Sequence, residues 1–152
     1  MELGLFDLVG EGVRTLVPEK LGEVRFRAHK YGVKVWLGTA EAPREHYEAQ
    51  VMGPRDVPAA KTLAVEVGFH SEHPKPDLNT AVLDHLRAKQ ATWRKALGRE
   101  AELGPFLGRR TDWGRVSETW LDPDLGEEDL SFELAARLTD YITALEPVLR
   151  KR

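Results

Sequence analysis

The chain has 152 residues, 41% hydrophobic and 31% charged, which predicts one globular domain spanning residues 1–152 and argues against wholesale disorder and a membrane span. It contains no cysteine, which excludes disulfides, thiolate metal ligands and a cysteine nucleophile and fits a reducing, cytoplasmic compartment. Lys and Arg total 22 against 25 Asp and Glu, so the formal charge of −3 does not mark a nucleic-acid binder. The first residues lack a basic region, so we expect no secretory signal.

The first half of the chain predicts a helix followed by strands. Apolar residues recur at helical spacing over residues 3–17, although its three glycines each cost about 1 kcal/mol relative to alanine. Residues 23–38 alternate apolar and polar side chains around Lys30-Tyr31-Gly32, which predicts a β-hairpin, and segments 46–52 and 63–70 alternate in the same way. Short consecutive strands without room for a crossover helix favour antiparallel pairing.

The second half is predicted to be mainly helical. A helix follows Pro76, with Asp77 or Asn79 as its cap, and continues to Leu97 before Gly98. Residues 99–114 are predicted as a loop with room for one helical turn, and 116–121 as a short fifth strand. A last helix follows the acidic residues 127–129, and Pro147 should end or kink it. The prediction is an α+β fold: an antiparallel sheet of four to five strands with an N-terminal helix and two C-terminal helices packed on one face.

The predicted sheet has one apolar face, which belongs to the core, and one polar face. The polar face could be a ligand platform, with a tryptophan for stacking and arginines for anions. It could equally be a solvent-facing side stabilised by cross-strand ion pairs. A register slip of one residue would exchange the faces. The polar side chains are Arg25, Arg27, His29, Lys34, Trp36, His46, Glu48, Gln50, Glu66 and His70.

The candidate catalytic residues lie on this polar face. They are His46, Glu48, Glu66 and His70, because histidine titrates near neutral pH and a carboxylate can be tuned by burial. Glu66, His70 and His73 are candidate metal ligands by residue type, although no His-Glu-x-x-His spacing is present and we assign no metal. The chain has no Gly-x-Ser-x-Gly elbow and no phosphate-binding or dinucleotide loop, so we expect no cofactor.

A second candidate binding element is the segment 109–115, where Trp113 accompanies three arginines, among them Arg110. These side chains could contact phosphate or an acidic protein surface. The alternative is a tryptophan that caps the core under a charged loop.

Two resemblances point toward nucleic acids. Asp56 followed by Glu66-Val67-Gly68 resembles the Asp and Glu-x-Lys order of restriction-type nucleases, but glycine stands where their lysine belongs. The segment from Leu83 through Trp120 resembles the closing part of an uncharacterised bacterial domain found attached to restriction-endonuclease-like proteins. That resemblance implies a link to nucleic-acid or defence systems and carries over no site residue. The residues behind it are Leu86, Lys89, Trp93, Leu97-Gly98 and the strand Val116 to Trp120.

Three functions follow from these observations. We prefer a noncatalytic binding or interaction module that uses the polar face, at Arg25, Arg27, His29, Lys34 and Trp36, or the loop with Arg110 and Trp113. Its partner would be a protein or a second copy of the chain, and no membrane is expected. The alternatives are a hydrolase or metal-dependent enzyme with a His/Glu site on the sheet, and a nucleic-acid-associated protein.

Overall fold

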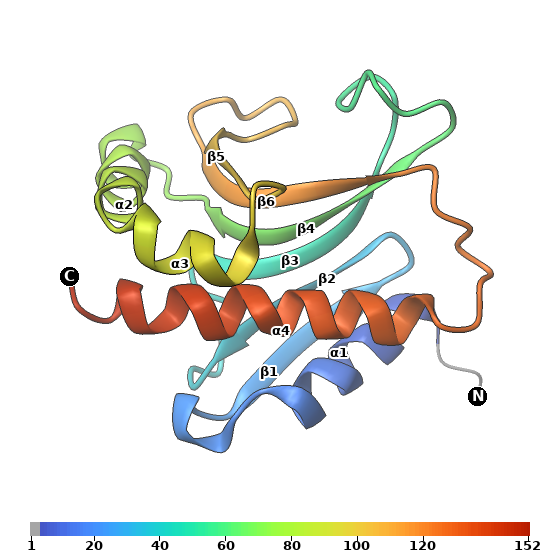
Figure 1. Ribbon diagram of the computed structural model, residues 1–152, viewed down its shortest axis with the longest axis horizontal. Helices are drawn as coiled ribbons and strands as arrows, with labels where there is room; N and C mark the ends of the chain where they lie inside the picture. Colours follow the sequence, from blue (N-terminus) through green and yellow to red (C-terminus); the bar gives the residue numbers. More distant parts are fainter. Residues whose placement is uncertain (1–3) are drawn as a thin grey trace.

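The computed structural model describes residues 4–152 and has an α+β fold, with a six-stranded antiparallel sheet and four α-helices in that range (Figure 1). The spatial order of the strands is β1-β2-β3-β4-β6-β5. The strands are β1 (Val24–His29), β2 (Gly32–Leu37), β3 (Glu45–Met52), β4 (Ala64–Ser71), β5 (Glu102–Pro105) and β6 (Gly114–Leu121). The helices are α1 (Leu5–Leu16), α2 (Pro76–Ala88), α3 (Gln90–Leu97) and α4 (Leu130–Leu149).

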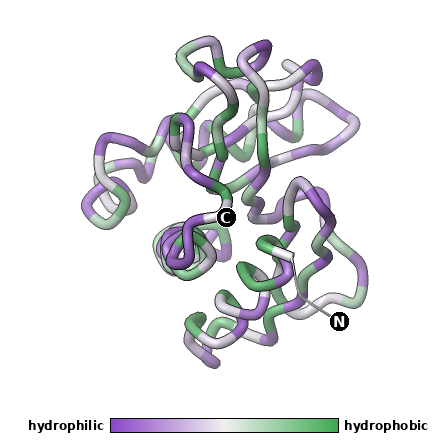
Figure 2. Tube along the Cα trace, turned by 90° about the vertical axis from the view of Figure 1, so that its right-hand side faces the viewer, coloured by the Kyte–Doolittle hydropathy of each residue, from purple (hydrophilic) through white to green (hydrophobic). Residues whose placement is uncertain are grey.

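The main core lies between one face of the sheet and the helices α1 and α4 (Figure 1). The register places Tyr47 opposite Val35 and Phe69, and Phe69 opposite Val116, so these buried side chains share the helix side. Figure 2, which shows α4 nearly end-on, shows hydrophobic and hydrophilic residues alternating along the strands. The predicted apolar face is therefore confirmed as the core face. None of the helices within residues 4–152 has the length and apolar character needed to span a bilayer.

The helical predictions are confirmed in outline and corrected in detail. The first helix begins at Leu5; residue 3 of the predicted range lies outside the described residues. The single helix predicted after Pro76 is divided at Lys89, whose φ of −107° and ψ of 14° leave the helical region. The indole of Trp93 donates to the Leu86 carbonyl at 2.8 Å, a bond that occupies an acceptor at the break. The helix α4 continues through Pro147 to Leu149, so Pro147 does not end it, and only two helical residues follow the proline.

The sheet contains one more strand than the upper limit predicted. Glu102–Pro105 pairs with β6 as an edge strand in a segment predicted to be a loop. Its sequence, Glu-Leu-Gly-Pro, carries no alternation, and proline is accepted in a sheet mainly at an edge. The strand is thus defined by its neighbour β6 and not by its own pattern.

The predicted cap of α2 is wrong, because Lys75 precedes the helix and Pro76 occupies its start. Asn79 instead is buried and links two loops. Its Oδ1 accepts hydrogen bonds from the Ser71 hydroxyl at 2.8 Å and the His73 amide at 2.9 Å, and its Nδ2 donates to the carbonyls of His73 and Asp112. These bonds join the end of β4 to the loop before β6.

Candidate functional site

The predicted polar face forms as one surface on the side of the sheet away from α1 and α4. Residues directly opposite one another share a face, and the register pairs His46 with His70, Gln50 with Glu66 and Lys34 with Glu48. Nearer the β1 edge, it pairs Arg25 with Trp36 and Arg27 with Lys34. The polar side chains named from the sequence therefore do lie on one face.

The centre of this face is buried, so the interpretation as a solvent-facing surface is wrong there. Glu66 and His70 are 0% exposed, and His46 is 2% exposed. The loops 53–63 and 106–113 rise over this side of the sheet (Figure 1). The Phe106 ring lies 5.1 Å from the ring of His70, and Leu107 packs against a small apolar cluster that includes residues of the first loop. At the β1 edge, Arg27 and His29 remain exposed.

Four side chains converge at the buried centre, and we call them the His/Glu cluster: His46, Glu48, His70 and Glu72. His46 Nε2 lies 3.1 Å from Glu48 Oε1 and 3.5 Å from Glu72 Oε2. His70 Nδ1 lies 3.2 Å from each of the same two oxygens. One ligand atom from each residue lies within 4.8 Å of the other three.

Both imidazoles are oriented by acceptors on their far sides. His46 Nδ1 lies 2.9 Å from the Pro43 carbonyl oxygen, and His70 Nε2 lies 3.0 Å from Glu66 Oε2. Because a carbonyl or an ionised carboxylate only accepts, these two nitrogens carry their protons. The other nitrogen of each ring, His46 Nε2 and His70 Nδ1, therefore faces the cluster with a lone pair when the ring is neutral.

Glu66 lies on the far side of His70 from the cluster, and both of its carboxylate oxygens accept hydrogen bonds. Its Oε2 also accepts from the Ser117 hydroxyl at 2.6 Å, and its Oε1 accepts from the Gln50 amide at 2.8 Å. Ser117 in turn accepts a hydrogen bond from Arg115 at 2.9 Å. The network thus runs from the imidazole of His70 through Glu66 and Ser117 to a buried guanidinium.

Protons bind tightly to the histidines of the cluster in the absence of other cations. Burial opposes the charged form of His70, but the carboxylates of Glu66, Glu48 and Glu72 outweigh it and raise the pKa of His70 well above its usual value. The pKa of His46 is raised in the same way by Glu48 and Glu72, against the effect of burial. Burial would raise the pKa of Glu48, but hydrogen bonds from both histidines lower it to about 2.

The charged groups around the cluster are three carboxylates, two imidazoles and one lysine. Glu48, Glu66 and Glu72 are buried beside the imidazoles, and Lys34 Nζ lies 3.6 Å from Glu72 Oε1. With both imidazoles protonated, two positive charges lie among these carboxylates. A divalent ion bound to the neutral imidazoles would supply the same charge, so it could replace the two protons without changing the net charge of the site.

Glu72 is the residue of the cluster that the sequence predictions omitted. It follows the end of β4 and lies two positions after His70, so strand alternation would have placed it on the same side. His73, which was a candidate ligand, instead pairs with Glu45 at 2.7 Å outside the cluster. Glu66 contacts the far nitrogen of His70 and is thus a supporting group.

Lys34 reaches the cluster, with its Nζ 3.6 Å from Glu72 Oε1, whereas the predicted arginines and Trp113 lie away from it. Arg110 stacks on the Trp113 ring, with 4.6 Å from its guanidinium carbon to the ring centroid, in the loop next to β5. Arg25 and Arg27 belong to β1, the opposite edge of the sheet. The two predicted binding elements are therefore separate. At Gly68, a Cβ would lie 2.6 Å from the Cβ of Ser117, so the position of the nuclease lysine leaves no room for a side chain.

Comparison with known family models, curated proteins and solved structures found no match to this chain. The resemblance of the segment from Leu83 through Trp120 to a restriction-associated domain stays a prediction. Function is argued below from the chemistry of the sites.

Proposed function

We propose that the protein binds one divalent transition-metal ion in the His/Glu cluster and uses it in metal-dependent chemistry. The observation that carries the proposal is the convergence of two imidazole nitrogens and two carboxylate oxygens in a buried space. Metal bonds of about 2.0–2.1 Å at tetrahedral angles put neighbouring ligand atoms about 3.3–3.4 Å apart. The four nitrogen-to-oxygen distances in the cluster are 3.1, 3.2, 3.2 and 3.5 Å, and the nitrogen-to-nitrogen and oxygen-to-oxygen distances are within 4.8 Å.

The ligand set favours a transition metal over calcium or magnesium. Imidazole nitrogen suits zinc, iron and related ions, whereas calcium and magnesium prefer oxygen ligands throughout. The far nitrogens also have the partners that metal-bound histidines use, a backbone carbonyl for His46 and the carboxylate of Glu66 for His70. These partners hold each ring so that its free nitrogen points to the place of the ion.

The proposed centre would supply Lewis acidity and could lower the pKa of a bound water. Four protein ligands complete a tetrahedral zinc site, whereas an octahedral ion would keep two positions for water or substrate. His46, Glu48, His70 and Glu72 would hold the ion, and Glu66 would fix the orientation of His70. The competing explanation is a structural ion network that takes no metal.

Metal binding to the purified protein separates these explanations. The protein is stripped with a chelator, dialysed separately against Zn²⁺, Mn²⁺ or anaerobic Fe²⁺, and its metal content is measured by mass spectrometry. We expect one ion per chain for at least one metal, and an affinity at least about tenfold weaker in His46→Gln and Glu72→Gln. The exposed His29→Gln is the matched control and should bind as the unchanged protein does. No stoichiometric metal with any of these ions would refute the proposal.

A second candidate function is anion binding at the β1 edge, in line with the predicted binding module. Three arginines, Arg14, Arg25 and Arg27, line a hollow of about 620 Å³ together with Trp36 and two glutamates, Glu23 and Glu41. The Nε of Arg25 is buried there and has no hydrogen-bond partner among residues 4–152. Calorimetry with inorganic phosphate and pyrophosphate tests this role: Arg27→Gln should weaken binding about tenfold, as loss of a charge-assisted bond does. Equal binding by this variant would exclude it.

A further inference from the structure

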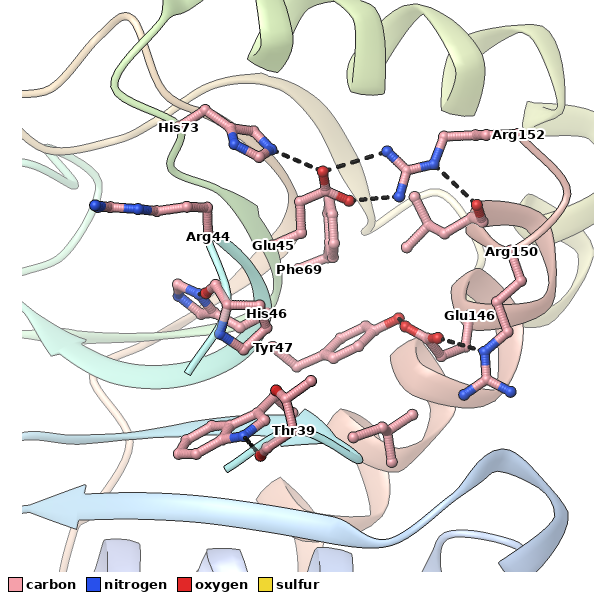
Figure 3. A pocket seen from close by; sticks show the side chains of 14 residues that line it. Thr39, Arg44, Glu45, His46, Tyr47, Phe69, His73, Glu146, Arg150 and Arg152 are labelled. Atoms are coloured by element: carbon pink, nitrogen blue, oxygen red, sulfur yellow. Dashed lines mark hydrogen bonds and ion pairs between the residues drawn. The ribbon is translucent and has the colours of Figure 1, made fainter. Parts of the chain in front are cut away.

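A cavity of about 440 Å³ lies beside the His/Glu cluster, where β2 and β3 separate (Figure 3). Their pairing ends at Val35 and Tyr47, so the last two residues of β2 and the first two of β3 are not paired with each other. The C-terminal end of α4 forms the other wall. Figure 3 shows Tyr47 pointing across toward Glu146 of α4. The volume lies within the range of about 300–1,000 Å³ that is typical of small-molecule pockets.

The two carboxylates of this cavity are already bound by cations. Glu45 receives hydrogen bonds from Arg152 at 2.6 Å and faces His73 at 2.7 Å. Glu146 accepts from Arg150 Nε at 2.8 Å. Neither carboxylate is left as a free acceptor for a cationic ligand. Each of these arginines also donates to a backbone carbonyl, Arg150 to Leu21 and Arg152 to Leu149, out of the five N–H donors of a guanidinium.

The remaining lining combines positive charge with apolar surface. Arg44 is the third guanidinium of the lining, is exposed, and makes no ion pair within residues 4–152, so the lining holds three arginines and two glutamates. Trp36, Phe69 and Leu149 supply aromatic and aliphatic walls. A cavity with apolar walls and an excess of cationic donors is complementary to an organic anion with an apolar body.

His46 connects this cavity to the His/Glu cluster. Its ring lines the cavity, while its Nε2 faces Glu48 and Glu72. We propose that the cavity is the substrate pocket of the proposed metal centre and that it selects small amphipathic carboxylates. The assignment as a substrate pocket rests on the proposed function, whereas the selectivity for carboxylates rests on the lining alone.

Isothermal calorimetry with octanoate, octylamine and acetate tests the selectivity, using the full chain in metal-free and zinc-loaded forms. We expect octanoate to bind at least about tenfold more tightly than either of the others. Arg44→Gln removes the lining guanidinium that makes no ion pair within residues 4–152 and should weaken octanoate about tenfold. Lys151→Gln removes a positive charge that lines a different hollow, between α3 and α4, and should leave octanoate binding unchanged.

The two proposals fail in different ways in this experiment. Absence of octanoate binding, equal binding of octylamine, or equal losses in the two variants would overturn the carboxylate pocket even if zinc binds. A pocket that shares His46 with the metal ion should be coupled to it. The zinc-loaded protein should therefore bind octanoate with an affinity at least about threefold different from that of the metal-free protein. An unchanged affinity in a protein that binds one zinc would overturn the link to the metal. Octanoate binding without metal binding would overturn the proposed function and leave an anion pocket.

Discussion

Replacing Glu66 by glutamine removes one charge from the centre of the polar face and almost no volume. Glu66 is fully buried and accepts hydrogen bonds from His70, Ser117 and Gln50. A glutamine oxygen can keep the bonds from His70 and Ser117, and its NH₂ group can donate to Gln50 once that amide turns over. The substitution therefore tests the charge of Glu66 and not the shape of the site.

The size of the effect follows from the bonds that change. A hydrogen bond to a charged group contributes about 1.5–3 kcal/mol and a neutral one about 0.5–1.5 kcal/mol. Loss of the charge opposite His70 should therefore lower the free energy of unfolding of the metal-free protein by about 1–2 kcal/mol. Loss of a carboxylate that orients a metal-bound histidine typically weakens metal affinity by about 10–100-fold.

Guanidinium unfolding of the metal-free protein and zinc titration measure the two effects. The matched control is Glu11→Gln, because Glu11 pairs with Arg14 at 3.2 Å and both side chains are about half exposed. A surface ion pair contributes less than about 1 kcal/mol, so this control should change neither measurement much. Equal stability and equal zinc affinity for Glu66→Gln and the unchanged protein would refute the assigned role of Glu66.

Three further predictions concern pH, a loop contact and a helix contact. In the metal-free protein, the pKa of His70 is raised, so His70 stabilises the fold fully below about pH 6.5 and loses this contribution as pH rises through its pKa in the folded protein. The pKa of Glu48 is lowered, so Glu48 stabilises the fold above about pH 4.5 and loses this contribution as pH falls toward about 2. Unfolding free energies should thus peak between these limits, and a steady rise to alkaline pH would contradict this. Asn79→Ala breaks the four-bond link between loops and should cost about 2–4 kcal/mol in urea unfolding; a loss below about 1 kcal/mol would show that the link contributes little. Gly10→Ala should destabilise the protein by about 1 kcal/mol or more despite alanine's better helix propensity, because the new Cβ would lie 2.4 Å from the Phe26 ring; a higher thermal midpoint would count against that contact.

The faces of the sheet were accessible from the sequence because strand alternation is local. Side chains two residues apart point to the same side whatever the strand pairs with, and the apolar side of each strand belongs to the core. The polar residues His46, Glu48, Glu66 and His70 could therefore be assigned to one face before any pairing was known. The same rule would have included Glu72. The apolar stripes of α1 and α4 are local patterns of the same kind.

The tertiary structure decided which of these polar residues meet and how deeply they are buried. His46 and His70 face each other only because β3 pairs with β4 in one register. Phe106, which packs against the ring of His70, comes from the loop between β5 and β6, and no strand pattern contains this contact. The strand β5 and the break at Lys89 likewise depend on β6 and on Trp93.

Alternation along a strand depends on neighbouring residues, whereas burial depends on contacts between distant segments. The sequence by itself therefore determined a sheet with one polar face. Only the tertiary structure made the centre of that face a buried His/Glu cluster.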